Sequence, residues 1–122
     1  MLVLKVEPGK KAVAKEIENE LEALQKEVGG YIERIYPFEE DSVAILANEE
    51  GILLNLQLNR TIRNNDGTII NAIVGTFLVV GVGEDDFVSL SDDLLQKYLK
   101  YYETPEFFGI HNGKIVVFGG SH

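Results

Sequence analysis

The sequence predicts an α+β fold: a mixed, largely antiparallel sheet with two main helices packed on it and a C-terminal β-hairpin. Three observations support this fold class. Segments with the two-residue alternation of strands outnumber helical segments, and a long strand-rich stretch separates the two helical segments. Asp66-Gly67 and Asn112-Gly113 are hairpin turn signals. The chain lacks the regular strand–helix alternation of a parallel sheet, and we expect both helices on one face.

The first third of the chain predicts a strand, a turn and a helix. Residues 2–6 alternate as a strand does, and Pro8-Gly9 then favours a turn. Residues 12–17 fit either a second strand or an early start of the helix. We expect the helix over 20–28, with Asn19 as N-cap, Glu22 at the third helical position and Gly29 as the stop.

Several strands follow in the middle of the chain. Residues 30–36 alternate and end at Pro37, and residues 43–47 form a short apolar run. Residues 68–74 and 76–82 are two further strands separated at Gly75. The second of these is apolar on both parities, which predicts a central strand buried on both faces. Residues 59–65 are ambiguous between strand, helix and loop.

The last third predicts the second helix and the final hairpin. The helix spans 92–102, with Ser91 as N-cap and a hydrophobic staple between Leu90 and Leu95. Residues 107–111 then pair with 114–118. We expect one domain over 1–118, and a flexible tail or cloning remnant over 119–122.

Composition excludes several classes of protein. The 122 residues contain no cysteine, which excludes disulfides, a thiol nucleophile and cysteine-bound metals. Two histidines argue against a histidine metal cluster or a catalytic triad. The net charge of −9 opposes direct nucleic-acid binding. No apolar run is long enough to span a membrane and no signal segment is visible, so we expect a cytoplasmic protein without a cofactor.

The strongest candidate ligand site is the donor-rich segment Asn59, Arg60 and Thr61. An arginine fork there would suit a phosphate or carboxylate, with Asn48, Glu49 and Glu50 as further candidates. A structural alternative exists for each part: Arg60 pairs with an internal carboxylate, and residues 48–51 only form a turn.

A second candidate is the acidic loop Glu84, Asp85 and Asp86, whose oxygens could bind Mg²⁺ or Ca²⁺. Its spacing does not match an EF-hand, and a solvated loop is the favoured interpretation. The Gly81-Val-Gly83 pair after a strand is not a dinucleotide site, because a third glycine is missing and carboxylates there would repel a pyrophosphate.

Stretches along most of the chain resemble a small uncharacterised family, the domain of unknown function family 3846. The similarity is carried by the order and spacing of short segments between residues 3 and 100. They are Val6-Glu-Pro-Gly-Lys10, Leu21-Glu-Ala-Leu-Gln25, Val28-Gly-Gly-Tyr-Ile-Glu33, Asn48-Glu-Glu-Gly51, Leu58-Asn-Arg60, Gly75-Thr-Phe77, Val79-Val-Gly81, Asp86-Phe87 and Ser89-Leu90. The resemblance implies a bacterial, phage or mobile-element setting and an accessory role, and it transfers no catalytic residue.

These observations favour a non-enzymatic protein-binding module with an acidic surface and a protein partner of unknown identity. The alternative is a small-molecule or nucleotide-binding protein, with or without enzymatic activity, centred on Arg60. The sequence leaves the oligomeric state open.

Overall fold

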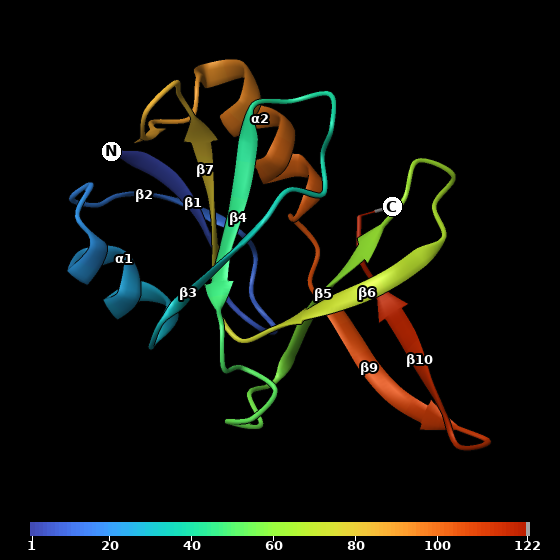
Figure 1. The fold of residues 1–122 in the computed structure, drawn as a ribbon. Helices are drawn as coiled ribbons and strands as arrows, with labels where there is room; N and C mark the ends of the chain where they lie inside the picture. Colours follow the sequence, from blue (N-terminus) through green and yellow to red (C-terminus); the bar gives the residue numbers. More distant parts are fainter. Residues whose placement is uncertain (122) are drawn as a thin grey trace.

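The computed structural model describes residues 1–121 and is built around one antiparallel sheet (Figure 1). The strand order is β2-β1-β7-β4-β3, and β8 pairs with β7. Each strand pairing is antiparallel, as in the largely antiparallel sheet that the sequence predicts. These strands are β1 (Leu2–Val6), β2 (Val13–Glu16), β3 (Ile32–Ile35), β4 (Val43–Asn48), β7 (Phe77–Val82) and β8 (Phe87–Val88).

The predicted central strand is confirmed. β7 lies between β1 and β4, and its residues 77–81 are buried. Its side chains alternate between two apolar clusters, one on each face of the sheet. β4 is buried along its whole length for the same reason. The strand is apolar on both parities because both faces of the sheet are covered.

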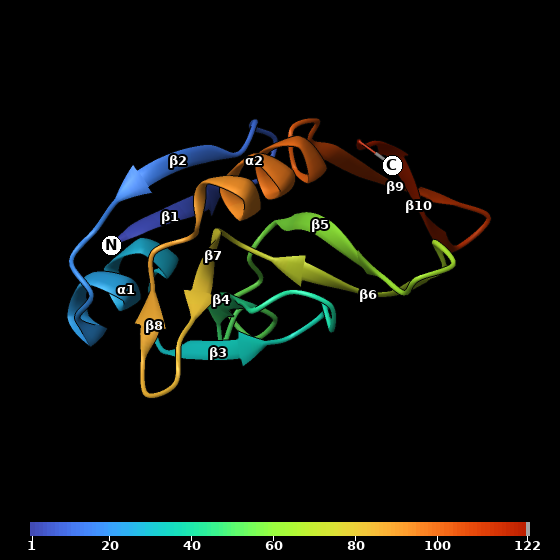
Figure 2. The same cartoon turned by 90° about the horizontal axis from the view of Figure 1, so that it is seen from above.

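The two helices lie on opposite faces of the sheet, so the expectation of helices on one face was wrong (Figure 2). Helix α1 (Leu21–Val28) buries Leu24 and Val28 on one face, and α2 (Asp92–Tyr101) buries Leu95 and Tyr98 on the other. A sheet whose central strands are apolar on both sides needs a cover on each, and one helix supplies each cover.

One predicted helix cap is present and one is not. The Ser91 hydroxyl accepts a hydrogen bond from the Leu94 N–H at 3.3 Å and caps α2. Asn19 does not cap α1, because its side-chain amide donates to the Asp86 carboxylate and the Phe87 carbonyl instead. Gly29 ends α1 in the left-handed conformation, with φ of 81°.

Two separate ribbons extend from the sheet. One pairs β5 (Leu58–Arg63) with β6 (Ile69–Val74), and the other pairs β9 (Glu106–His111) with β10 (Lys114–Gly119). The predicted hairpin turn at Asn112-Gly113 is confirmed, with φ of 51° and 76°. The ambiguous segment 59–65 is therefore mostly strand, and the 12–17 segment contains strand β2.

The tail predicted over 119–122 is described up to Ser121. Gly119 is the last residue of β10, and the Ser121 hydroxyl accepts a hydrogen bond from the Thr104 N–H at 2.8 Å. His122 lies outside the described residues. None of the helices within residues 1–121 has the length and apolar character of a membrane span.

An ion pair ties α2 to the loop before β4 and makes stability depend on pH. The Asp41 carboxylate accepts hydrogen bonds from Lys97 Nζ and from the Tyr98 hydroxyl, each at 2.6 Å. These hydrogen bonds lower the pKa of Asp41 below its ordinary value of 3.8. The stabilisation is therefore fully present above that ordinary value and is lost as the pH falls through the lower, folded-state pKa.

We expect Asp41→Asn to reduce the free energy of unfolding by about 1 kcal/mol at neutral pH, because Lys97 is half exposed and water screens its charge. Urea titrations of both proteins between pH 7 and pH 2 check this expectation. The difference in the free energy of unfolding between the two proteins should disappear at acidic pH. A difference that is the same at every pH would contradict the expectation.

Candidate functional site: a groove between α1 and the edge of the sheet

Arg60, the centre of the sequence-predicted ligand site, is fully buried in the protein. Its Nη2 donates to the Lys10 carbonyl at 2.7 Å and to the Tyr102 carbonyl at 3.0 Å. Its Nη1 donates to the Asn59 side-chain oxygen at 2.8 Å. The guanidinium thus joins the loop after β1 to the C-terminal end of α2. Burial lowers the pKa of Arg60 below its ordinary value, and the charge of Glu106 opposes that shift.

The two neighbours of Arg60 are buried as well. The Asn59 side-chain amide donates to the carbonyls of Val6 and Gly75, at 2.9 and 2.8 Å. The Thr61 hydroxyl donates to the Glu106 carboxylate at 2.8 Å, and the Thr61 backbone N–H also lies within hydrogen-bond distance of it. These polar groups connect β5 to β1, to Gly75 just before β7, and to β9, so their visible role is structural.

The second half of the predicted site lies elsewhere. The Asn48 amide donates to the Val28 carbonyl at the end of α1, and its oxygen accepts from the Glu50 N–H at 2.8 Å. Asn48 is therefore bound to α1, while Arg60 is bound to the end of α2 on the opposite face of the sheet. The structure does not bring the two halves of the predicted ligand site together.

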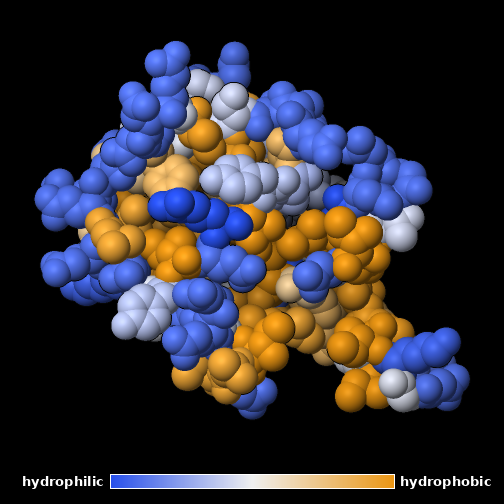
Figure 3. All heavy atoms as spheres, in the orientation of Figure 1, coloured by the Kyte–Doolittle hydropathy of each residue, from blue (hydrophilic) through white to orange (hydrophobic). Residues whose placement is uncertain are grey.

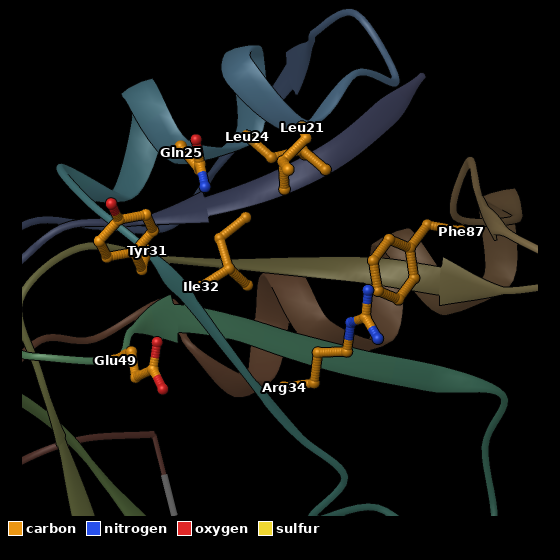
Figure 4. Close-up of a pocket in the computed structure, with 8 residues that line it drawn as sticks. All are labelled: Leu21, Leu24, Gln25, Tyr31, Ile32, Arg34, Glu49 and Phe87. Carbon is orange, nitrogen blue, oxygen red and sulfur yellow. The ribbon is translucent and has the colours of Figure 1, made fainter.

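Glu49 does line a groove, which runs between α1 and β3 (Figure 4). The groove has a volume of about 350 Å³, within the usual range for ligand pockets. In Figure 4, α1 forms the upper wall, β3 crosses below it, and Phe87 and Glu49 lie near opposite ends. Its lining residues are Leu21, Leu24, Gln25, Tyr31, Ile32, Arg34, Glu49 and Phe87.

β3 is an edge strand of the main sheet, and its outer side has unpaired backbone groups within the described chain. The Tyr31 carbonyl accepts from the Glu49 N–H at 2.8 Å, so Tyr31 is hydrogen-bonded towards β4. Backbone direction alternates along an antiparallel strand. The N–H and C=O groups of Ile32 and Arg34 therefore point away from the sheet, and their side chains line the groove.

Charged side chains lie at both ends of this groove. The Arg34 guanidinium lies over the Phe87 ring, 5.2 Å from its centroid, near one end. Glu84, Asp85 and Asp86 line an adjoining hollow together with Arg34. Glu49 lies at the other end, and Glu50 lines the neighbouring hollow with Tyr31. Carboxylates thus flank an apolar floor at both ends, with one arginine beside them.

The acidic loop, the second sequence candidate, takes part in holding the fold. The Asp86 carboxylate accepts from the Asn19 amide at 3.2 Å and from the Phe87 N–H at 2.8 Å. Across residues 1–121, no cluster of three His, Cys, Asp or Glu side chains is arranged to hold a metal ion. Glu84 and Asp85 instead line the hollow that adjoins the groove beside Arg34.

Comparison with protein-family models places residues 1–103 in a family described as a domain of unknown function, DUF3846. The chain belongs to this family. The match to DUF3846 covers the main sheet, both helices and the β5–β6 ribbon, and it ends before β9. The groove therefore lies within the family domain. No curated protein and no solved structure matches the chain.

Sequence reasoning identified Glu49 but missed the groove as a whole. The sequence shows Leu21 and Leu24 on the apolar side of α1, yet Leu21 is 62% exposed and Tyr31 is 64% exposed. Large apolar side chains exposed on both sides of one helix–strand junction are a signal for a binding groove. This signal can be recognised only when the strand order, which puts β3 at the edge of the sheet, is known.

Proposed function

We propose that this chain is a non-enzymatic protein-binding module, which takes an extended segment of a partner protein along the free edge of β3. The observation that carries the proposal is an unpaired strand edge directly beside an apolar groove. In strand addition, backbone hydrogen bonds to an exposed edge provide affinity, and neighbouring pockets select alternate side chains. β3 offers the backbone groups of Ile32 and Arg34, and α1 offers the pocket wall.

The chemistry of the groove favours a partner segment with alternating apolar and basic residues. Apolar side chains facing α1 would contact Leu21, Leu24 and Ile32. Lysine or arginine side chains, which alternate to the opposite face of the sheet, would meet Glu33 and Glu49 there. The net charge of −9 would also speed the approach of a basic partner.

An accessory role in a phage or mobile element fits such a module and remains part of the proposal. It is supported by the family resemblance seen in the sequence, since a small domain without a transferable catalytic residue acts most simply by binding another protein. A basic segment of a host protein has the chemistry that the groove suits.

A pair of variants tests strand addition at β3. Arg34→Pro and Arg34→Ala both remove the guanidinium, but only proline removes the outward N–H. We expect labelled short peptides with alternating valine and lysine to bind Arg34→Pro at least tenfold more weakly than Arg34→Ala, measured by fluorescence polarisation. Equal affinities would show that the outward N–H is not used and would overturn the proposal.

Leu21→Gln tests the apolar wall without disturbing the core, because Leu21 is mostly exposed. We expect a several-fold loss of peptide affinity and an unchanged melting temperature. A peptide with glutamate in place of lysine should bind more weakly to every variant. Stabilisation of the protein by nucleotides and not by these peptides would favour small-molecule binding instead.

A further inference from the structure

The β9–β10 hairpin exposes an unusual amount of apolar side chain. Ile110 and Ile115 face each other across the ribbon and are 80% and 65% exposed. Phe107 and Phe118 form another cross-strand pair, 54% and 59% exposed. Phe107 and Ile110 are an odd number of positions apart on β9, so the two pairs lie on opposite faces of the ribbon. The hairpin is therefore apolar on both faces.

Figure 3 shows that this apolar surface continues beyond the hairpin. Hydrophobic atoms extend from the hairpin at lower right over the β5–β6 ribbon. Ile69 and Ile70 of β6 are 45% and 62% exposed. Contiguous apolar surfaces of this kind are rare on monomeric proteins and mark interaction sites.

The outer edge of β10 has a row of backbone groups that point away from β9. The two-residue turn makes His111 and Lys114 a hydrogen-bonded pair, and the Gly120 N–H donates to the Pro105 carbonyl in the same register. The intervening residues Ile115, Val117 and Gly119 therefore direct their N–H and C=O groups outward. Figure 1 places this edge on the side of the hairpin away from the main sheet.

We infer that two copies of this chain associate through β10, and form a four-stranded antiparallel sheet from their two hairpins. The β10 edge is separate from the β3 groove, and β10 lies beyond the part of the chain that matches the family. A long, flat, apolar edge strand is a template for pairing with another strand. Most proteins block such edges with charges or bulges, whereas β10 carries one charge, Lys114, at its turn end.

Charge favours a second copy at this position. The chain as a whole has a net charge of −9, yet residues 107–119 contain no acidic residue. The hairpin is thus a place where two acidic copies can meet without carboxylates facing carboxylates. A basic protein, the alternative partner for this hairpin, would have no carboxylate to bind here.

Symmetry is also compatible with pairing along β10. A two-fold axis normal to the ribbon places one residue of β10 opposite the same residue of the second copy. Val116 or Val117 can take that central position. Centred on Val116, Lys114 lies opposite Phe118 of the second copy. Centred on Val117, Lys114 lies opposite Gly120 of the second copy. Neither register places the two lysines opposite each other.

Pairing along β10 would also bring apolar side chains of the two copies into contact. Ile115 and Val117 lie on one face of β10, and Val116 and Phe118 lie on the other, so both faces of the four-stranded sheet would carry apolar cross-strand contacts. Ile115 and Phe118 are 65% and 59% exposed in the single chain.

Sedimentation equilibrium of the full chain tests the inference, with Val117→Pro and Val117→Ala as a matched pair. Both variants lose the valine side chain, and only proline loses the outward N–H, while the bonds from β10 to β9 remain. We expect wild type and Val117→Ala to reach twice the 13.6 kDa chain mass at micromolar concentration. We expect Val117→Pro to dissociate at least tenfold more readily.

Ile115→Lys provides a second variant, because it places a charge within the interface at a site that is already 65% exposed. Circular dichroism confirms that each variant is folded, and peptide binding at β3 should not change in any of them. Wild-type protein that remains at 13.6 kDa up to high micromolar concentration would overturn the inference. Equal dimerisation of Val117→Pro and Val117→Ala would overturn it as well.

Discussion

Replacing Arg60 by alanine is expected to lower the free energy of unfolding by about 3–5 kcal/mol. Arg60 is fully buried and ranks among the largest side chains of the interior. Its removal leaves a cavity, deprives the Lys10 carbonyl of the Nη2 donor, and leaves the Tyr102 carbonyl only the longer hydrogen bond from the Ala12 N–H, at 3.4 Å. Each buried acceptor that loses its partner costs about 1–3 kcal/mol. Urea unfolding followed by circular dichroism measures the loss.

Arg60→Met is the control that separates volume from hydrogen bonding. Methionine fills much of the space. It also removes Arg60 Nε, which is the one buried side-chain nitrogen or oxygen in residues 1–121 that has no hydrogen-bond partner. We expect Arg60→Met to be more stable than Arg60→Ala and less stable than wild type. A stable, folded Arg60→Ala protein would show that the arginine is not a structural link, and would return it to the candidates for ligand binding.

The elements that the sequence predicts well are those in which the local pattern and the tertiary environment agree. Residues 76–82 are apolar on both parities, and they form the central strand. Asn112-Gly113 demands positive φ at both turn positions and obtains it. The cap at Ser91 forms because its partner, the Leu94 N–H, lies within the same helix. The turn and the cap depend on interactions that are local in the sequence, and the burial of the central strand follows from its own apolar pattern.

The failures occur where a distant partner competes. Asn19 has the correct spacing for a helix cap, but Asp86 and Phe87, which are distant in the sequence, bind its amide instead. Residues 59–65 are ambiguous in the sequence because polar side chains occupy both parities. Residues 59–62 are the buried part of β5, because carbonyls and carboxylates from distant segments accept their hydrogen bonds. Backbone carbonyls carry no sequence signature, so this arrangement could not be predicted.

The candidate site also depends on partners that are distant in the sequence. An isolated donor-rich segment in an acidic chain predicts a charged ligand, and Arg60 does bind oxygen atoms with both of its terminal nitrogens, Nη1 and Nη2. Those oxygens belong to the protein. Glu49 belongs to a polar cluster just after a predicted strand, and it lines the groove because β4 ends beside α1 and β3. The edge position of β3 depends on strand order, which no local pattern encodes.

Replacing Glu106 by alanine should loosen the β9–β10 hairpin and lower the free energy of unfolding by about 2–4 kcal/mol. Glu106 is 2% exposed, and its carboxylate accepts hydrogen bonds from the Thr61 hydroxyl and backbone N–H. It therefore occupies the outer edge of β5 and joins the hairpin to the family domain. Amide exchange should become faster across residues 106–119 before it changes in the main sheet.

Glu106→Gln distinguishes charge from hydrogen bonding at this junction, because the amide oxygen still accepts from Thr61. We expect it to retain more of the stability than Glu106→Ala. Since the charge of Glu106 also acts on buried Arg60, the effects of Glu106→Gln and Arg60→Met should not be additive. Additive effects would mean that the two groups act independently. Uniform exchange protection in Glu106→Ala would mean that the hairpin is held by its apolar contacts alone.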